Sequence, residues 1–173
     1  MGNLKGRLNV INTFMFDVDG VLSDGSVWTH PDGAQIRRMN IKDGYAIQHA
    51  VKKGYNIIII SGGTSESVRK RLSTLGVTEI NLGAKSKLEV YEKMLTKYQI
   101  ASNQVLYMGD DIPDYPVMQK VGFAACPRDA AHEIKSICHY ISPKEGGQGC
   151  ARDVIEQVLT LHKKWFDEDS FEW

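Results

Sequence analysis

The sequence predicts an α/β fold, a three-layer, Rossmann-like parallel sheet with helices on both faces. Apolar runs of strand length alternate with segments whose apolar residues recur at helical spacing over most of the 173 residues. The run at 55–60 is apolar and β-branched without alternation, which is typical of a central parallel strand. Gly54 and Gly76 directly follow predicted helices, where a helix C-cap is expected. In such sheets, ligands bind beyond the carboxyl ends of the strands.

The first half of the chain supplies three strands and a hairpin. Residues 10–18 mix apolar and β-branched types before Gly20, which predicts a buried strand that ends in a turn. Residues 24–40 place a Pro-Asp-Gly turn between two short strand-like runs, which predicts a small β-hairpin flap. The elements that follow are predicted in alternation: a helix at 43–53, a strand at 55–60, a helix at 65–75 and a strand at 77–82.

The second half continues the alternation. Residues 85–98 carry apolar residues on one face of a helix, and the strand predicted at 104–108 ends at Gly109. The later elements are shorter: a helix at 115–121, a strand at 122–125, a helix at 130–136, a strand at 139–141, a glycine-rich link at 146–149 and a helix at about 151–165. The sequence assigns no partner to the acidic, aromatic tail at 166–173.

Length and composition limit the function classes. The chain has the length of one domain, expected over 1–173, with the flap at about 24–40 and a C-terminal tail at about 146–173. Lys and Arg (21) balance Asp and Glu (21), so the overall charge does not attract nucleic acid or an anionic membrane. The three cysteines are odd in number and lack the CxxC spacing of a zinc site, which argues against a disulfide framework. No signal peptide or membrane anchor is visible. We therefore expect a cytoplasmic protein.

Acidic and hydroxyl side chains follow three of the predicted strands. Parallel strands bring their carboxyl ends to one edge, so we expect one crevice to contain Asp17, Asp19, Ser61, Asp110, Asp111 and Asp114. Crowded carboxylates repel one another unless a cation lies between them, and oxygen ligands suit Mg²⁺. A single acidic residue at a strand end is more often a solvated turn or capping residue, which is the better explanation of Asp111 alone. The ordered set is harder to explain in that way.

This ordered set resembles the haloacid dehalogenase superfamily over nearly the whole chain. The first motif is Asp17-Val18-Asp19-Gly20-Val21, the second Ser61, the third a lysine, and the fourth the string from Gly109 to Asp114. Family spacing favours Lys87 over Lys85 as the lysine. Larger members insert a cap domain, for which this chain has no room.

The resemblance implies an Mg²⁺-dependent phosphatase. Asp17 would be the nucleophile and Asp19 the general acid and base, with Ser61 and Lys87 as further catalytic residues. Asp17, Asp110 and the backbone carbonyl of Asp19 would bind the metal. Asp114 would orient the lysine, and Asp111 would support the metal site.

The resemblance narrows to the capless sugar-acid phosphatases, notably those of 3-deoxy-D-manno-octulosonate 8-phosphate, a lipopolysaccharide precursor. The residues that carry it lie at 21–25, 40–45, 109–118 and 146–152. Such relatives are tetramers in which neighbouring subunits complete each site, which implies a homotetramer here. We expect the 146–152 segment to fold over an active site, although a glycine-rich segment is also typical of a flexible link. The implied substrate contacts, beside Asp19 and Lys87, are Asn40, Ile41, Lys42, Asp43, Gly44, Gln48, Gly62 and Arg71.

Two alternatives stay open, and the first is a phosphatase of 2-keto-3-deoxy-nononate 9-phosphate. Many octulosonate-phosphate phosphatases have arginine where this chain has Gly63. Phosphatases of 2-keto-3-deoxy-nononate 9-phosphate tend to have glutamate there and a lysine near Thr74, and the chain matches neither pattern. A noncatalytic oligomerisation module is the second alternative, although the intact pair of Asp17 and Asp19 argues against it.

Overall fold

The structure is a computed structural model that describes residues 4–172, and a six-stranded parallel sheet forms its centre. The central strand is β1 (Thr13–Phe16), whose Phe14 lies beside Ile57 and Leu106 of the two neighbouring strands. This sheet confirms the predicted α/β class. Its strands lie in the order β5 (Glu79–Asn81), β4 (Asn56–Ile60), β1, β6 (Val105–Met108), β7 (Phe123–Cys126) and β8 (Tyr140–Ile141).

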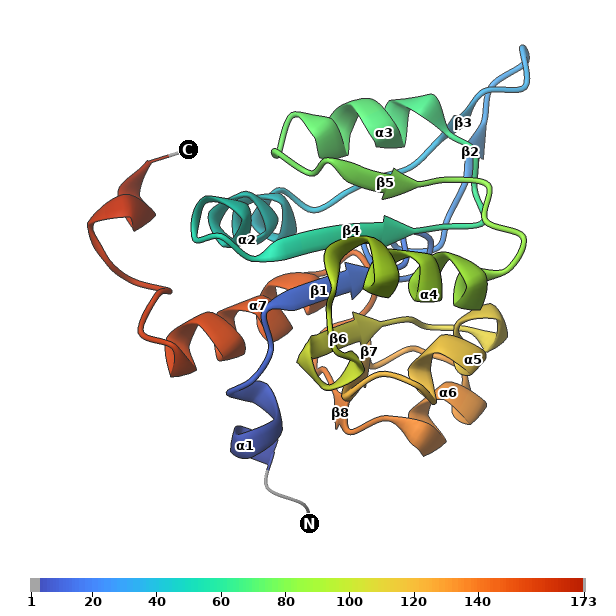
Figure 1. Cartoon of the computed structure of the whole chain (residues 1–173). Coiled ribbons are helices and arrows are strands. Elements are labelled where there is room, and N and C mark those ends of the chain that lie inside the picture. Colours follow the sequence, from blue (N-terminus) through green and yellow to red (C-terminus); the bar gives the residue numbers. More distant parts are fainter. Residues whose placement is uncertain (1–3, 173) are drawn as a thin grey trace.

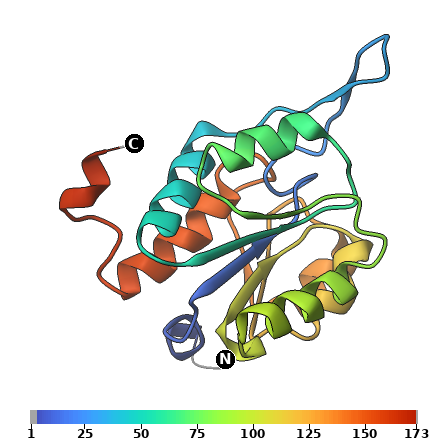
Figure 2. The ribbon, with the colours of Figure 1, turned by 45° about the horizontal axis from the view of Figure 1, so that its top comes forward.

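Helices cover both faces of the sheet, as the two views in Figures 1 and 2 show. Alternate strand residues point to opposite faces, so Phe14 and Phe16 belong to one buried cluster and Met15 to the other. The predicted three layers are therefore present. The first cluster packs under α2 (Ile41–Lys52), α3 (Glu66–Ser73) and α7 (Cys150–Leu161), and the second under α4 (Lys87–Tyr98), α5 (Tyr115–Met118) and α6 (His132–Ile137).

The predicted flap is an antiparallel pair of β2 (Trp28–Thr29) and β3 (Gln35–Ile36). Figure 1 shows it projecting beyond the edge of the sheet where β1 and β4 end. Trp28 is 74% exposed on this hairpin. Between β1 and β4 the described chain holds only the flap and α2, so no cap domain is inserted there.

Several element ends differ from the prediction. The first strand stops at Phe16, which leaves Asp17 and the residues after it in a loop. Helix α2 begins at Ile41, two residues earlier than predicted, because Asn40 Oδ1 accepts the N–H of Lys42 at 2.8 Å. Periodicity did not predict α1 (Leu4–Leu8) or the 3₁₀ helices η1 (Ser102–Gln104), η2 (Ile112–Asp114) and η3 (Glu168–Phe171).

The C-terminal tail packs at the end of the molecule opposite the flap, as Figures 1 and 2 show. Lys53 Nζ pairs with Asp167 at 2.7 Å and with Asp169 at 2.6 Å. The tail therefore has a partner that the sequence did not indicate. Trp173 lies outside the described residues. Over residues 4–172, the helices are too short and too polar to cross a bilayer.

Candidate active site

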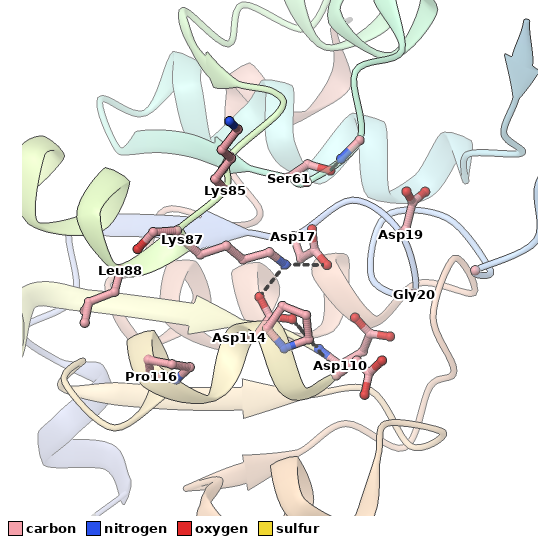
Figure 3. A pocket seen from close by; sticks show the side chains of 17 residues that line it. Asp17, Asp19, Gly20, Ser61, Lys85, Lys87, Leu88, Asp110, Asp114 and Pro116 are labelled. Atoms are coloured by element: carbon pink, nitrogen blue, oxygen red, sulfur yellow. Dashed lines mark hydrogen bonds and ion pairs between the residues drawn. The ribbon is translucent and has the colours of Figure 1, made fainter.

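A cleft of about 760 Å³ opens where the central strands end. It is formed by the loops after β1, β4, β5 and β6, because parallel strands present their carboxyl ends at the same edge. Figure 3 shows the side chains that these loops direct into it. The predicted residues that line the cleft are Asp17, Asp19, Ser61, Gly62, Lys85, Lys87, Asp110, Asp111 and Asp114.

Lys87 is the buried cation of the cleft. It is the first residue of α4, and Ser86 caps that helix by accepting the N–H of Glu89. Its Nζ contacts Asp17 at 2.9 Å and Asp114 at 2.7 Å. Burial opposes its charged form, but the two carboxylates outweigh burial and raise the pKa of Lys87. Lys85 is exposed at the rim, so the geometry selects the lysine that family spacing favours.

Asp114 holds Lys87 in place. Its Oδ1 accepts hydrogen bonds from Lys87 and from the Tyr107 hydroxyl at 2.5 Å, and its Oδ2 accepts the N–H of Asp110 at 3.2 Å. Both oxygens are thus engaged within the protein. Gly109 makes this packing possible, because a Cβ there would lie 2.4 Å from the Asp114 Cγ. Sequence reasoning missed the role of Tyr107, which it placed only within a strand.

The three carboxylates crowd one another. One oxygen each from Asp17, Asp110 and Asp114 lies within 4.8 Å of the others. Burial and the Asp114 charge raise the pKa of Asp17 to about 6, although Lys87 opposes the shift. Burial and the two neighbouring carboxylates raise the pKa of Asp110 to about 8. One lysine therefore does not neutralise the cluster.

This donor set fits a hard divalent cation. Asp114 is saturated by its hydrogen bonds, which leaves the Asp17 and Asp110 carboxylates to take a metal ion. A cation between them would offset the burial and the repulsion that together raise both pKa values. The Asp110 carboxylate lies against the backbone of Gly20, where a Cβ would come within 1.9 Å of Oδ2. Gly20 of the first motif is therefore needed to leave room for the Asp110 carboxylate of the fourth motif.

Asp19 is held on the side of the flap. Figure 3 shows its carboxylate apart from the group formed by Asp17, Lys87 and Asp114. Arg37, one residue after β3, donates to both of its oxygens, from Nε at 2.6 Å and from Nη2 at 3.0 Å. Sequence reasoning missed Arg37, because no pattern fixes where the flap folds relative to the loop after β1.

Ser61 follows β4 directly and is buried at the floor of the cleft. Its N–H donates to the Asn81 carbonyl at 2.9 Å, which continues the pairing of β4 with β5. Its Oγ accepts the N–H of Gly63 at 3.2 Å, so the hydroxyl proton is available to a ligand.

Most of the predicted substrate contacts do not line this cleft. Asn40 and Lys42 border a separate hollow of about 460 Å³. Asp43 is buried and accepts the N–H groups of Gly149 and Arg152 at 3.2 and 2.7 Å, so it supports the start of α7. Burial raises its pKa to about 6 against these hydrogen bonds. Ile41, Gly44, Gln48 and Arg71 also lie outside the cleft lining.

The glycine-rich segment from Gly146 packs against the loop after β1. Gly147 donates its N–H to the Val21 carbonyl at 2.9 Å, and the Cys150 thiol contacts the same carbonyl at 3.2 Å. A Cβ at Gly146 would lie 2.0 Å from the Gly20 carbonyl oxygen. These glycines therefore let the segment approach the loop that carries Asp17 and Asp19.

Known proteins share both sequence and fold with the chain. The family model for haloacid dehalogenase-like hydrolases matches residues 73–152. A 3-deoxy-D-manno-octulosonate 8-phosphate phosphatase of Escherichia coli is 36% identical over 162 residues, which cover 94% of this chain and 86% of that protein. The corresponding enzyme of Yersinia pestis is 34% identical over 89% of this chain and 82% of its own length.

Solved structures of such phosphatases share the fold of this chain. The Yersinia pestis phosphatase superposes with a TM-score of 0.91 at 32% identity, covering 94% of this chain and 88% of that one. The Moraxella catarrhalis phosphatase, determined with a magnesium ion, a phosphate ion and KDO, has a TM-score of 0.89 at 30% identity and covers 93% and 92% of the two chains.

Proposed function

The chain belongs to the haloacid dehalogenase-like hydrolases, within the family of 3-deoxy-D-manno-octulosonate 8-phosphate phosphatases, and from this premise we propose its reaction and substrate. The chain is a phosphoric monoester hydrolase. The proposed reaction is Mg²⁺-dependent hydrolysis of 3-deoxy-D-manno-octulosonate 8-phosphate to the free sugar acid and phosphate, a step in making a lipopolysaccharide precursor. The observation that carries it is the buried contact of Lys87 with both Asp17 and Asp114, beside Asp110.

Asp17 is the proposed nucleophile. Its carboxylate attacks phosphorus in line, so that a bond from the Asp17 oxygen to phosphorus forms as the bond to the sugar oxygen breaks. Lys87 lies 2.9 Å from this carboxylate and neutralises charge on the phosphoryl oxygens. The Ser61 hydroxyl donates to another of these oxygens. Because Asp114 fixes Lys87, the attacking and stabilising groups are ordered before the substrate arrives.

Asp19 moves the protons in both halves of the reaction. It first protonates the departing sugar oxygen, and then takes a proton from the water that hydrolyses the aspartyl-phosphate on Asp17. The Asp17 and Asp110 carboxylates, with the Asp19 carbonyl, would hold Mg²⁺. The ion would supply positive charge to the phosphate oxygens and between the carboxylates.

We also propose that the enzyme is a cytoplasmic homotetramer whose neighbouring copies complete each site. Among the described residues that line the cleft, Lys85 is the only cation besides Lys87, and one exposed lysine is little for binding a sugar carboxylate. Arg71 would reach the site of another copy, and residues 40–44 at the start of α2, with Gln48, would then take part. The exposed Trp28 and Ile36 of the flap support packing against a second copy.

The test is phosphate release with Mg²⁺, compared as kcat/KM for the octulosonate 8-phosphate and the nononate 9-phosphate. A preference of about tenfold for the first, about 1.4 kcal/mol in transition-state binding, supports the proposal. The opposite preference would assign the nine-carbon sugar acid phosphate as the substrate. The Asp17→Asn variant is the control and should release nothing. No release from either substrate by the wild-type protein would favour the noncatalytic module.

A further inference from the structure

The flap places two neighbouring arginines in opposite environments. Arg37 is 5% exposed in its side chain, whereas Arg38 is 69% exposed and pairs with Asp24 at 2.7 Å. Arg37 meets Asp19 as a planar fork, with Nε on one carboxylate oxygen and Nη2 on the other. Two parallel hydrogen bonds fix both the position and the plane of a carboxylate, which one contact does not.

Gly63 provides the space for this pair. A Cβ at Gly63 would lie 3.3 Å from Arg37 Nη2 and 3.4 Å from Asp19 Oδ2. A longer side chain would enter the space that the guanidinium occupies. The chain therefore combines a glycine at position 63 with an arginine from the flap that lies beside it.

Stability alone does not explain the contact. The Nη1 atom of Arg37 is buried without a hydrogen-bond partner in the part of the chain that the structure describes. A buried, unpaired donor costs about 1–3 kcal/mol. Local arrangements that lower stability in this way are expected at functional sites.

We propose that Arg37 is a positioning residue, which holds the Asp19 carboxylate where it can pass a proton to the departing oxygen of the substrate. This inference rests on the proposed function. Asp19 first takes up a proton from solvent. As the bond from phosphorus to the departing oxygen breaks and the bond to Asp17 forms, this proton moves from Asp19 to the oxygen, which leaves Asp19 as the ionised carboxylate that Arg37 holds. Without the fork, Asp19 would rotate on its loop and meet the oxygen less often.

The leaving group separates positioning from a general structural role. An aliphatic alkoxide needs a proton to depart, whereas p-nitrophenolate is a much weaker base and departs without one. The value of kcat/KM for p-nitrophenyl phosphate reports transfer to Asp17 only. We expect Arg37→Met to lower kcat/KM for the octulosonate 8-phosphate by at least about tenfold, and that for p-nitrophenyl phosphate by less than about threefold.

Two further variants sharpen the comparison. Arg37→Lys keeps the charge without the fork and should restore part of the loss. Arg38→Met removes the same charge from the neighbouring flap position and should change neither substrate by more than about twofold. Equal losses for both substrates with Arg37→Met, or no loss with the aliphatic one, would overturn the proposal.

The test does not depend on the identity of the sugar acid. If the wild-type protein releases no phosphate from the octulosonate ester, the proposed substrate is wrong, and ribose 5-phosphate serves as the aliphatic ester instead. Crystal structures give a readout without turnover: Asp19 should occupy one conformer in the wild-type protein and several in Arg37→Met. A single, unchanged conformer in the variant would contradict the positioning role even if activity falls.

Discussion

Replacing Asp110 with asparagine should stabilise the metal-free protein while removing its response to Mg²⁺. The change keeps the shape of the side chain and removes one of three crowded carboxylates. The protein makes no side-chain hydrogen bond to the Asp110 carboxylate among the contacts described, so the substitution relieves repulsion without breaking a partner. The same carboxylate is a proposed ligand of Mg²⁺, which the amide replaces poorly.

The pKa of Asp110 gives the magnitude. It is raised from 3.8 to about 8, and each tenfold change in acid dissociation is worth about 1.4 kcal/mol. Ionising Asp110 at pH 8 in the folded protein therefore costs at most about 5 kcal/mol, and water at this partly exposed group reduces the cost to about 1–3 kcal/mol. For a domain of this size we expect the variant to unfold roughly 3–10 °C higher in EDTA.

The pH dependence follows from the sign of the shift. Between about pH 4 and pH 8 the folded wild-type protein keeps a proton on Asp110 that the unfolded chain has released. Wild-type stability is therefore lost as the pH rises through this window, and the advantage of Asp110→Asn should be smaller at pH 5 than at pH 8.

Thermal unfolding followed by circular dichroism in EDTA, at both pH values, measures this difference. Asp111→Asn is the matched control, because Asp111 is exposed and caps η2, a role that asparagine also fills. Adding Mg²⁺ should raise the unfolding temperature of the wild-type protein and of Asp111→Asn, but not of Asp110→Asn. If Asp110→Asn unfolds at or below the wild-type temperature in EDTA at pH 8, the reasoning from carboxylate repulsion is wrong.

Three further predictions concern other contacts of the site. Lys87→Met should lower kcat by at least about 100-fold, because it leaves Asp17 without its cation; a loss below tenfold in a phosphate-release assay would exclude this role. Gly20→Ala should reduce Mg²⁺ affinity in calorimetry, since the new methyl group collides with Asp110; unchanged affinity would show that the collision is absorbed elsewhere. Asp43→Asn should lower the free energy of unfolding by about 1–3 kcal/mol with KM unchanged; a raised KM at wild-type stability would instead return Asp43 to the substrate site.

The sequence predicted the fold well because the spacing of apolar residues indicates strands and helices, and glycines mark where the helices end. The apolar run before Ser61 became β4, and the Pro-Asp-Gly turn became the tip of the flap. Element ends were less predictable. Residues 10–12 have strand-like composition, yet β1 begins only at Thr13, where it can pair with both β4 and β6.

The structure brings together the predicted site residues that follow strands, whereas the placement of the residues between the strands was less predictable. Asp17 and Asp110 converge because the sheet is parallel. Arg37 meets Asp19 through the fold of a hairpin, a contact across 18 residues that no periodicity encodes. Asp43 was expected to contact the substrate, but whether a carboxylate in the first turn of α2 faces the cleft or accepts N–H groups from a distant helix depends on tertiary packing.

The contact of Gly147 with Val21 joins two segments that the ribosome makes at different times. The loop that carries Asp17 includes Val21. The Cys150 thiol, which contacts the Val21 carbonyl, lies 129 positions after Val21 in the chain. At roughly 5–20 residues per second, the loop that carries Asp17, the proposed nucleophile, waits on the order of 10 s for the segment that supports it. We therefore expect the loop that carries Asp17 to gain its full support in a nascent chain only after α7 has docked.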